Sequence, residues 1–257
     1  MLINILRINE QNCGDMSSSP MPYFDLPSPS KKTCIVNIMD FTKNPNDWVI
    51  FGGGGLFYEN KKASWTQKIA SFVESHYGPK IIWGAGSNIH QAGNQTSHDA
   101  ELLKKFDLVG IRDYGLGHRW VPCASCMSPL FDKNYEIKYD IGVYDHAEMP
   151  IFTTFPKCTN NTSMEKAINF LGSCNYVVTN TYHGAYWATL LKKKVIVLPL
   201  ENSSRFFFMR HKPVLVENLN DFDFTSAVKY ESALGDCRVA NIEFYKDFMK
   251  LIRKHII

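Results

Sequence analysis

The sequence lacks an excess of charge of either sign and any long hydrophobic run. Its 257 residues carry 28 Lys and Arg against 25 Asp and Glu, a formal net charge of +3. A balance this close to neutral argues against a dedicated nucleic-acid-binding protein. No apolar stretch approaches the ~18–20 residues that span a bilayer, and residues 1–7 are too short and too polar for a signal peptide. These absences predict a cytoplasmic protein without a membrane span of its own.

Cysteine is present in a number that does not suit a disulfide framework. Seven cysteines, an odd number, in a chain of this length are typical of reduced cytosolic thiols. Cys123 and Cys126 have C-x-x-C spacing, but the sequence holds no second such pair to complete a structural zinc site. We therefore expect packed thiols and no bound metal.

Apolar residues are plentiful, and their spacing indicates the fold class. Hydrophobic residues make up 45% of the chain, enough for a substantial core. Strands that alternate with helices predict the α/β class, with parallel sheets and right-handed crossovers. The expected strands are residues 2–6, 33–39, 48–51, 80–83, 108–111, 137–144, 176–179 and 194–198.

Helical patterns fall between several of these strands. Residues 65–76 carry an apolar stripe at i, i+3/i+4 spacing. Another helix opens at Thr162, which forms a capping-box pattern with Glu165. A third begins near His183, and residues 239–257 predict an amphipathic terminal helix that packs on the domains rather than on a membrane.

The strand–helix pattern occurs twice, in residues 1–135 and again in residues 136–257. We therefore expect two Rossmann-like, doubly wound domains that face each other across a cleft. Ligands bind outside the carboxyl ends of the strands in such sheets. The residues that follow strands are accordingly the candidates for function.

Three glycine-bearing turns follow expected strands, at residues 12–15, 52–55 and 84–86. Glycine permits positive φ and lets a ligand approach peptide N–H groups closely. None of the turns has G-x-G-x-x-G or P-loop spacing, so a standard dinucleotide or nucleoside triphosphate site is not indicated. Simple tight turns are the alternative interpretation, although four consecutive glycines exceed what such a turn needs. The candidate binding residues from these turns are Asn12, Gly14, Gly53, Gly54, Gly84 and Gly86.

The second half carries a sharper constellation around His183. Residues 177–184 run from a strand into a helix start, where N–H groups and the helix dipole attract anions. Residues 192–212 hold six Lys or Arg and one acid, Glu201, so positive charge is concentrated after the histidine. A solvated basic face is the alternative interpretation of this charge.

Two arginines are the candidate anion ligands. Arg205 lies with Ser204 in a loop after a strand, and Arg112 closes an earlier strand at the same kind of sheet edge. For Arg205, surface charge is an equally good interpretation. Carboxylates that could act as acid or base are Asp15, Asp113 and Asp140, which the sequence does not rank.

Taken in order, these motifs resemble the polysaccharide pyruvyl transferase family over about residues 9–210. The matching segments are Asn12-Cys13-Gly14-Asp15, Gly52 to Gly55, Trp83-Gly84-Ala85-Gly86, Arg112-Asp113 and Thr179 to Ala185. Segments 121–126 and 186–191 are similar to its short subgroup of xanthan ketal pyruvate transferases. In one departure, Thr181 stands where many members carry an arginine two residues before the histidine.

The resemblance implies a glycosyltransferase-B-like pair of domains and a phosphoenolpyruvate-dependent ketal pyruvate transferase. Such an enzyme forms a pyruvate ketal on a sugar of a bacterial capsule or exopolysaccharide, or of its lipid-linked repeat unit. Phosphoenolpyruvate is the co-substrate, and no further cofactor is implied. A lipid-linked acceptor would bring the protein to the inner face of the cytoplasmic membrane as a peripheral partner.

The resemblance also suggests roles for residues of this chain. His183 would be the general acid/base or a phosphate ligand, because the ordinary pKa of histidine lies near working pH. We expect an acceptor side in the first domain and a donor side in the second. The predicted catalytic residues are His183, Asp15 and Arg112. The predicted substrate-binding residues, besides those of the glycine turns, are Thr181, Tyr182, Gly184, Ser204 and Arg205.

Two other functions fit the same sequence. The first is a glycosyltransferase of the same architecture with a nucleotide-sugar donor, whose ribose Glu201 would bind. The second is a glycan-binding or assembly protein that has lost catalysis, which the threonine at position 181 keeps open.

Overall fold

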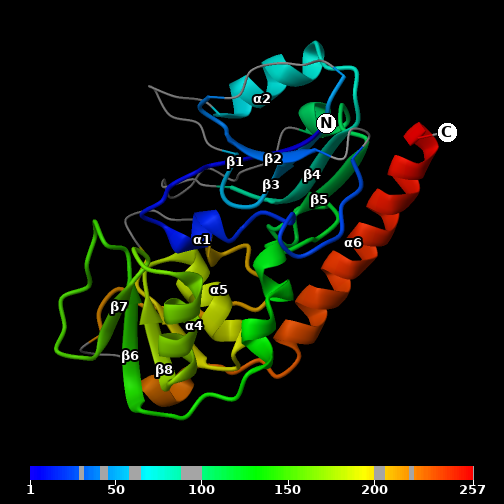
Figure 1. The fold of residues 1–257 in the computed structure, drawn as a ribbon. Helices are drawn as coiled ribbons and strands as arrows, with labels where there is room; N and C mark the ends of the chain where they lie inside the picture. The colour runs from blue at the N-terminus through cyan, green and yellow to red at the C-terminus, as the bar shows by residue number, and fades with distance from the viewer. Residues whose placement is uncertain are drawn as a thin grey trace.

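A computed structural model of the protein describes residues 1–28, 32–40, 46–57, 65–87, 100–199, 206–219 and 223–256. Two five-stranded sheets, parallel throughout, form the frame of the molecule, with helices packed on them (Figure 1). The predicted α/β class with parallel sheets is therefore confirmed.

The first sheet has the order β2-β1-β3-β4-β5. Its strands are β1 (Leu2–Leu6), β2 (Thr33–Asn37), β3 (Trp48–Gly52), β4 (Lys80–Ala85) and β5 (Leu108–Ile111). β1 and β3 are buried along their whole length, as expected of parallel strands covered on both faces. Helix α2 (Trp65–Glu74) packs Ile69, Phe72 and Val73 into the core on one face, and α3 (Ala100–Leu103) joins it.

The second sheet has the order β10-β9-β8-β6-β7. Its strands are β6 (Tyr139–Asp145), β7 (Lys157–Thr159), β8 (Cys174–Thr179), β9 (Lys194–Val197) and β10 (Val214–Leu215). Helices α4 (Met164–Gly172) and α5 (Tyr182–Leu190) pack on it. Every residue of α5 is buried, so this helix lies inside the molecule rather than on its surface.

Counted within each sheet, the strand order is the same, 2-1-3-4-5. This shared strand order is not apparent in the sequence, because β7 and β10 have only three and two residues and carry no recognisable strand pattern.

The start of α4 differs slightly from the prediction. Its N-cap is Ser163, whose Oγ accepts from the N–H of Lys166 at 3.2 Å, and not Thr162.

Helix α6 (Ala233–Ile256) connects the two halves and is longer than predicted. Its first turns place Ala233 and Cys237 in the core beneath α5. Further along, Phe244, Phe248 and Ile252 pack on the face of the first sheet that carries Trp83 (Figure 1, red helix).

The predicted boundary at residue 135 falls after the 3₁₀ turns η1 (Ala124–Met127) and η2 (Pro129–Asp132), and η4 (Phe224–Ser226) precedes α6. That division remains a prediction.

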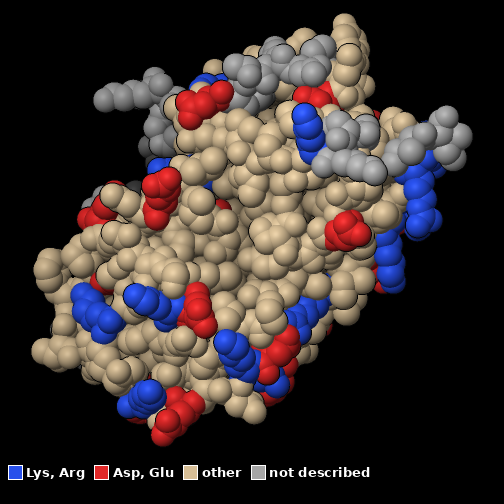
Figure 2. Space-filling view, viewed as in Figure 1, with Lys and Arg blue, Asp and Glu red and all other residues tan. Residues whose placement is uncertain are grey.

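The surface carries no dominant charge on the face seen in Figure 2. Basic and acidic side chains are interspersed there, and few of either lie in the middle of the face. Within the described residues, none of the helices has the length and apolar character needed to cross a bilayer.

Candidate functional site

The strand order locates a candidate site. In doubly wound sheets, ligands bind outside the carboxyl ends of the strands where the strand order reverses. In the first sheet this point lies between β1 and β3, which lead into the short helix α1 (Cys13–Met16) and the turn 52–55. In the second it lies between β6 and β8, and β8 leads into α5.

The two reversal points meet at α1. The N–H of Cys13 donates to the carbonyl of Asn160 at 3.0 Å, and its Sγ lies 3.3 Å from the hydroxyl of Tyr144 in β6. Asn12 caps α1 by accepting from the N–H of Gly14 at 3.1 Å, and its Nδ2 donates to Asp15 at 3.2 Å. The predicted turn 12–15 of the first half therefore lies directly on the second half.

His183 lies at this junction and is 7% exposed. A Cβ added to Gly14 would come within 2.3 Å of its Nδ1, so the imidazole rests against bare backbone. On its other side, Nε2 lies 3.5 Å from Sγ of Cys123. The rings of Tyr182 and Trp187 complete the enclosure, with centroids 5.4 and 5.1 Å away. The orientation of His183 is thus fixed by both halves of the molecule.

Cys123 was predicted only as a packed thiol, and the structure adds its contact with His183. Burial raises the pKa of the Cys123 thiol, so at neutral pH it stays protonated and is no nucleophile. Its Sγ also lies 3.2 Å from Oγ of Ser125, which accepts from the indole N–H of Trp187 at 3.0 Å. This chain of contacts ties the imidazole to η1. The sequence signals for this segment were the C-x-x-C spacing and the similarity of residues 121–126 to the short subgroup, and neither pointed to His183.

Thr181 is the N-cap of α5. Its Oγ1 accepts from the N–H of Gly184 at 2.9 Å and lies 3.1 Å from Oγ1 of Thr179. A Cβ on Gly184 would lie 2.3 Å from Oγ1 of Thr179. The residues predicted around His183 therefore set the entry angle of the helix and so the direction of the imidazole.

The turn 52–55 lies over the end of α1. Gly53 and Gly54 have φ of +73° and +78°, a conformation that L-residues adopt at a cost. A Cβ on Gly53 would come within 2.2 Å of the carbonyl oxygen of Ser18. On Gly54 it would lie 3.8 Å from Oγ of Ser18 and 3.9 Å from Oδ1 of Asp15, which are ordinary van der Waals contacts without a clash. Only the first of the two glycines is required by packing.

Arg112 and residues 84–86 close the same edge, and the predicted turn is here the end of β4, which runs to Ala85. Gly84 has φ of +68°, and a Cβ on it would lie 3.0 Å from the carbonyl oxygen of Pro122, while a Cβ on Gly86 would strike Cγ of Arg112 at 2.5 Å. The guanidinium of Arg112 donates to the carbonyl of Ser87 at 3.0 Å and lies 3.8 Å from Asp113. Its Cζ sits 3.9 Å from the centroid of the Tyr182 ring. Arg112 and His183 thus flank Tyr182 from two sides.

Some predicted residues do not join this cluster. Ser204, Arg205 and Glu201 lie outside the described residues. Asp140 is excluded by its place in the fold. It lies near the start of β6, exposed, where it accepts from Nδ2 of Asn175 at 3.0 Å. That is the edge of the sheet away from the carboxyl ends.

Two residues that the sequence analysis missed lie at the carboxyl edge of the second sheet. Asp145, the last residue of β6, is fully buried and pairs with Nζ of Lys157 at 3.0 Å. Within the described residues, its Oδ1 has no hydrogen-bond partner. Asn180 donates to the carbonyl of Met149 and accepts from the N–H of His146. The predicted strand stopped at residue 144, one short of the informative aspartate.

Comparisons with known proteins leave the family open. No family model matches the chain, and no curated protein matches it. Among the described residues, no three His, Cys, Asp or Glu side chains converge as a metal site would require.

Proposed function

We propose that this protein is a ketal pyruvate transferase that moves the pyruvyl group of phosphoenolpyruvate onto a sugar. The two parallel sheets would act as the halves of a glycosyltransferase-B-like enzyme, with the reaction at their junction. The observation that carries the proposal is His183, a titratable group at a helix N-terminus, enclosed by α1 of the other half and separated from Arg112 by one aromatic ring.

The reaction needs a proton on the methylene carbon, the removal of two hydroxyl protons, and contacts to the two anionic groups of phosphoenolpyruvate. A proton added to the methylene carbon of phosphoenolpyruvate creates an oxocarbenium-like centre, which a sugar hydroxyl attacks. Phosphate leaves, and a second hydroxyl closes the ketal. Of the two hydroxyl protons released, one makes up for the proton that enters the new methyl group, and the other leaves with the phosphate. His183 would move the proton, and Arg112 would hold the carboxylate or phosphate.

The sugar would approach from the first half. Gly54 lies beside Asp15 and carries no side chain, so a hydroxyl-rich ligand could approach its backbone closely. Asp15 would accept a hydroxyl proton there. We propose that the acceptor sugar belongs to a polysaccharide or to a lipid-linked repeat unit.

A binding panel tests the donor first. Thermal unfolding of the purified protein is followed with phosphoenolpyruvate, UDP, GDP and CMP in separate samples. A ligand at 100 times its Kd adds about 2.7 kcal/mol to the free energy of unfolding, which raises Tm by roughly 2–4 °C for a chain of this size. A shift with phosphoenolpyruvate alone supports the proposal. A shift with a nucleotide and none with phosphoenolpyruvate contradicts it and favours a glycosyltransferase.

A variant then separates an enzyme from a binder. With a candidate acceptor and phosphoenolpyruvate, His183→Gln is expected to lower phosphate release by on the order of 10²–10⁴-fold. His255→Gln, at the exposed end of α6, is the matched control and should keep full activity. Equal activity of the two variants would remove His183 from the chemistry.

A further inference from the structure

A second hollow lies beside the candidate site, on the neighbouring face of α5. Tyr182, Tyr186, Thr189 and Leu190, at i, i+4, i+7 and i+8, line it, whereas His183 lies on the face toward Cys123. Its mouth is open to solvent and its cavity volume is about 20 Å³, enough for a group little larger than a water molecule, so the hollow can take the charged end of a ligand and not a whole molecule. We call it the Arg210 pocket. Its remaining lining residues are Arg112, Trp120, Pro122, Met209, Arg210, His211 and Cys237.

The Arg210 pocket is basic. Arg112, Arg210 and His211 face it, and among the described residues that line it none is acidic. Trp120, Tyr182 and Tyr186 place aromatic rings in the remaining wall beside apolar side chains. A cation in such surroundings attracts an anion more strongly than one on the open surface.

The two basic side chains from the segment 209–211, Arg210 and His211, are held in place. Cζ of Arg210 stacks 4.7 Å from the ring centroid of Trp120, and its Nη2 lies 3.8 Å from Oδ2 of Asp236. Nε2 of His211 is 3.0 Å from the same oxygen. One carboxylate thus serves two basic side chains. Burial raises the pKa of Asp236, but hydrogen bonds from His211 and Ser232 outweigh it and hold the pKa below the ordinary value. The carboxylate therefore stays charged.

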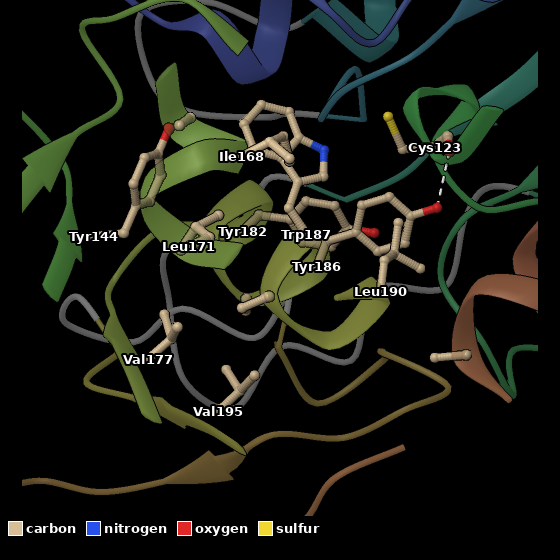
Figure 3. Close-up of a cluster of buried hydrophobic side chains, with 14 of the residues drawn as sticks. Cys123, Tyr144, Ile168, Leu171, Val177, Tyr182, Tyr186, Trp187, Leu190 and Val195 are labelled. Carbon is tan, nitrogen blue, oxygen red and sulfur yellow. Dashed lines mark hydrogen bonds between the residues drawn. The ribbon is translucent and has the colours of Figure 1, made fainter. Parts of the chain in front are cut away.

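Tyr182 supplies an uncharged donor. Its side chain is 7% exposed, and its hydroxyl makes no hydrogen bond with another described residue. Burial raises its pKa, so the proton stays on the oxygen. The hydroxyl of Tyr186, by contrast, is already used, because it donates to the carbonyl of Cys123 at 2.9 Å (Figure 3).

We infer that the Arg210 pocket binds the oxyanion group, phosphate or carboxylate, of a small organic molecule, between the guanidinium groups of Arg112 and Arg210 with Tyr182 as a donor. The inference rests on the proposed function in its use of Arg112 as an anion ligand, and it adds Arg210 and His211, which the proposed function does not use. Arg210 is the only one of these cations that reaches the mouth among the described residues, with its side chain 39% exposed, so it is the group that meets the ligand first.

Calorimetric titration with inorganic phosphate, pyruvate and phosphoenolpyruvate tests the inference. At least one of the three is expected to bind the wild-type protein, and Arg210→Gln should weaken that binding by roughly 10- to 100-fold, the value of a charge-assisted hydrogen bond. Lys212→Gln, an exposed cation two residues away, is the matched control and should stay within twofold. Inorganic phosphate and pyruvate are titrated separately, so the results show whether the pocket binds a phosphate group or a carboxylate group.

A local signal and a second variant complete the test. Because Arg210 stacks on Trp120, binding should change tryptophan fluorescence in the wild type and not in Trp120→Phe. His183→Gln should keep the binding. Loss of binding in His183→Gln with none in Arg210→Gln would overturn the inference while it supports the proposed function. Equal losses in Arg210→Gln and Lys212→Gln, or no binding of any of the three anions, would also overturn it.

Discussion

The two sheet edges that meet at the candidate site have the same strand order but are built from different groups. The first edge presents backbone, through Gly14 against the imidazole and Gly53 and Gly54 at positive φ. The second presents side chains, among which Thr179 and Thr181 are joined by hydrogen bonds that position His183. One topology therefore supports two kinds of surface.

The difference assigns a separate task to each half. A backbone edge permits the closest approach of a ligand and of the other half of the molecule. A side-chain edge brings the proton carrier and needs a network to orient it. The fold supplies the position of both, and the loops supply the chemistry.

The largest expected effect comes from adding a side chain where the two edges touch. In Gly14→Ala the new Cβ would lie 2.3 Å from Nδ1 of His183 and must displace the ring. A displacement of about 1 Å can cost on the order of 100-fold in rate, so we expect that loss in phosphate release. Gly235→Ala, where nothing lies within 4 Å, is the control. Wild-type activity in Gly14→Ala would show that His183 does not need this position.

The next test asks which glycine of the backbone edge is required for packing and which for ligand binding. Gly53→Ala combines positive φ with a backbone clash at 2.2 Å, and we expect it to lower the free energy of unfolding by about 2–5 kcal/mol. Gly54→Ala has positive φ alone and should cost about 1–2 kcal/mol. Denaturant titration measures both. If Gly54→Ala loses much more activity than its loss of stability explains, the acceptor binds against Gly54. If activity and stability fall in proportion, the turn has only a structural role.

A smaller effect tests the side-chain edge. Thr181→Ala removes the N-cap of α5 and should lower the free energy of unfolding by about 0.5–2 kcal/mol, with Thr181→Ser restoring most of it. Ser163→Ala removes the corresponding cap of α4, away from the site. The two caps should cost similar stability, while only Thr181→Ala should lower activity. Identical activity in both variants would mean that the cap does not orient His183.

The smallest expected effect is a pH dependence at the anchor of the segment that carries Cys123. Hydrogen bonds from Arg238 lower the pKa of Asp132. A lowered pKa stabilises the fold above the unfolded value of about 4 and loses that contribution as the pH falls further. Thermal unfolding of the wild type should therefore lose slightly more stability than Asp132→Asn between pH 7 and pH 3. Because Asp132 is largely exposed, the difference is small.

Local patterns predicted much of the fold, and long-range contacts account for what they missed. β1 and β5 have the predicted bounds, because short runs dominated by apolar residues between polar turns suit buried parallel strands. The strand order could not be predicted, since it depends on pairing between segments far apart in the chain. For the same reason the sequence indicated Gly14 and His183 separately but not that they touch, and it gave no reason to connect Cys123 with either.

Helix α6 has a consequence for how the protein is made. Phe244, Phe248 and Ile252 cover a face of the first sheet whose strands all lie among the first 111 residues. During synthesis those strands leave the ribosome well before the residues that shield them. Trp83 and its neighbours then remain uncovered while the whole second sheet is translated, an interval in which exposed apolar surface invites aggregation. Early strands that depend on a late helix are the kind of nascent chain that a chaperone would hold.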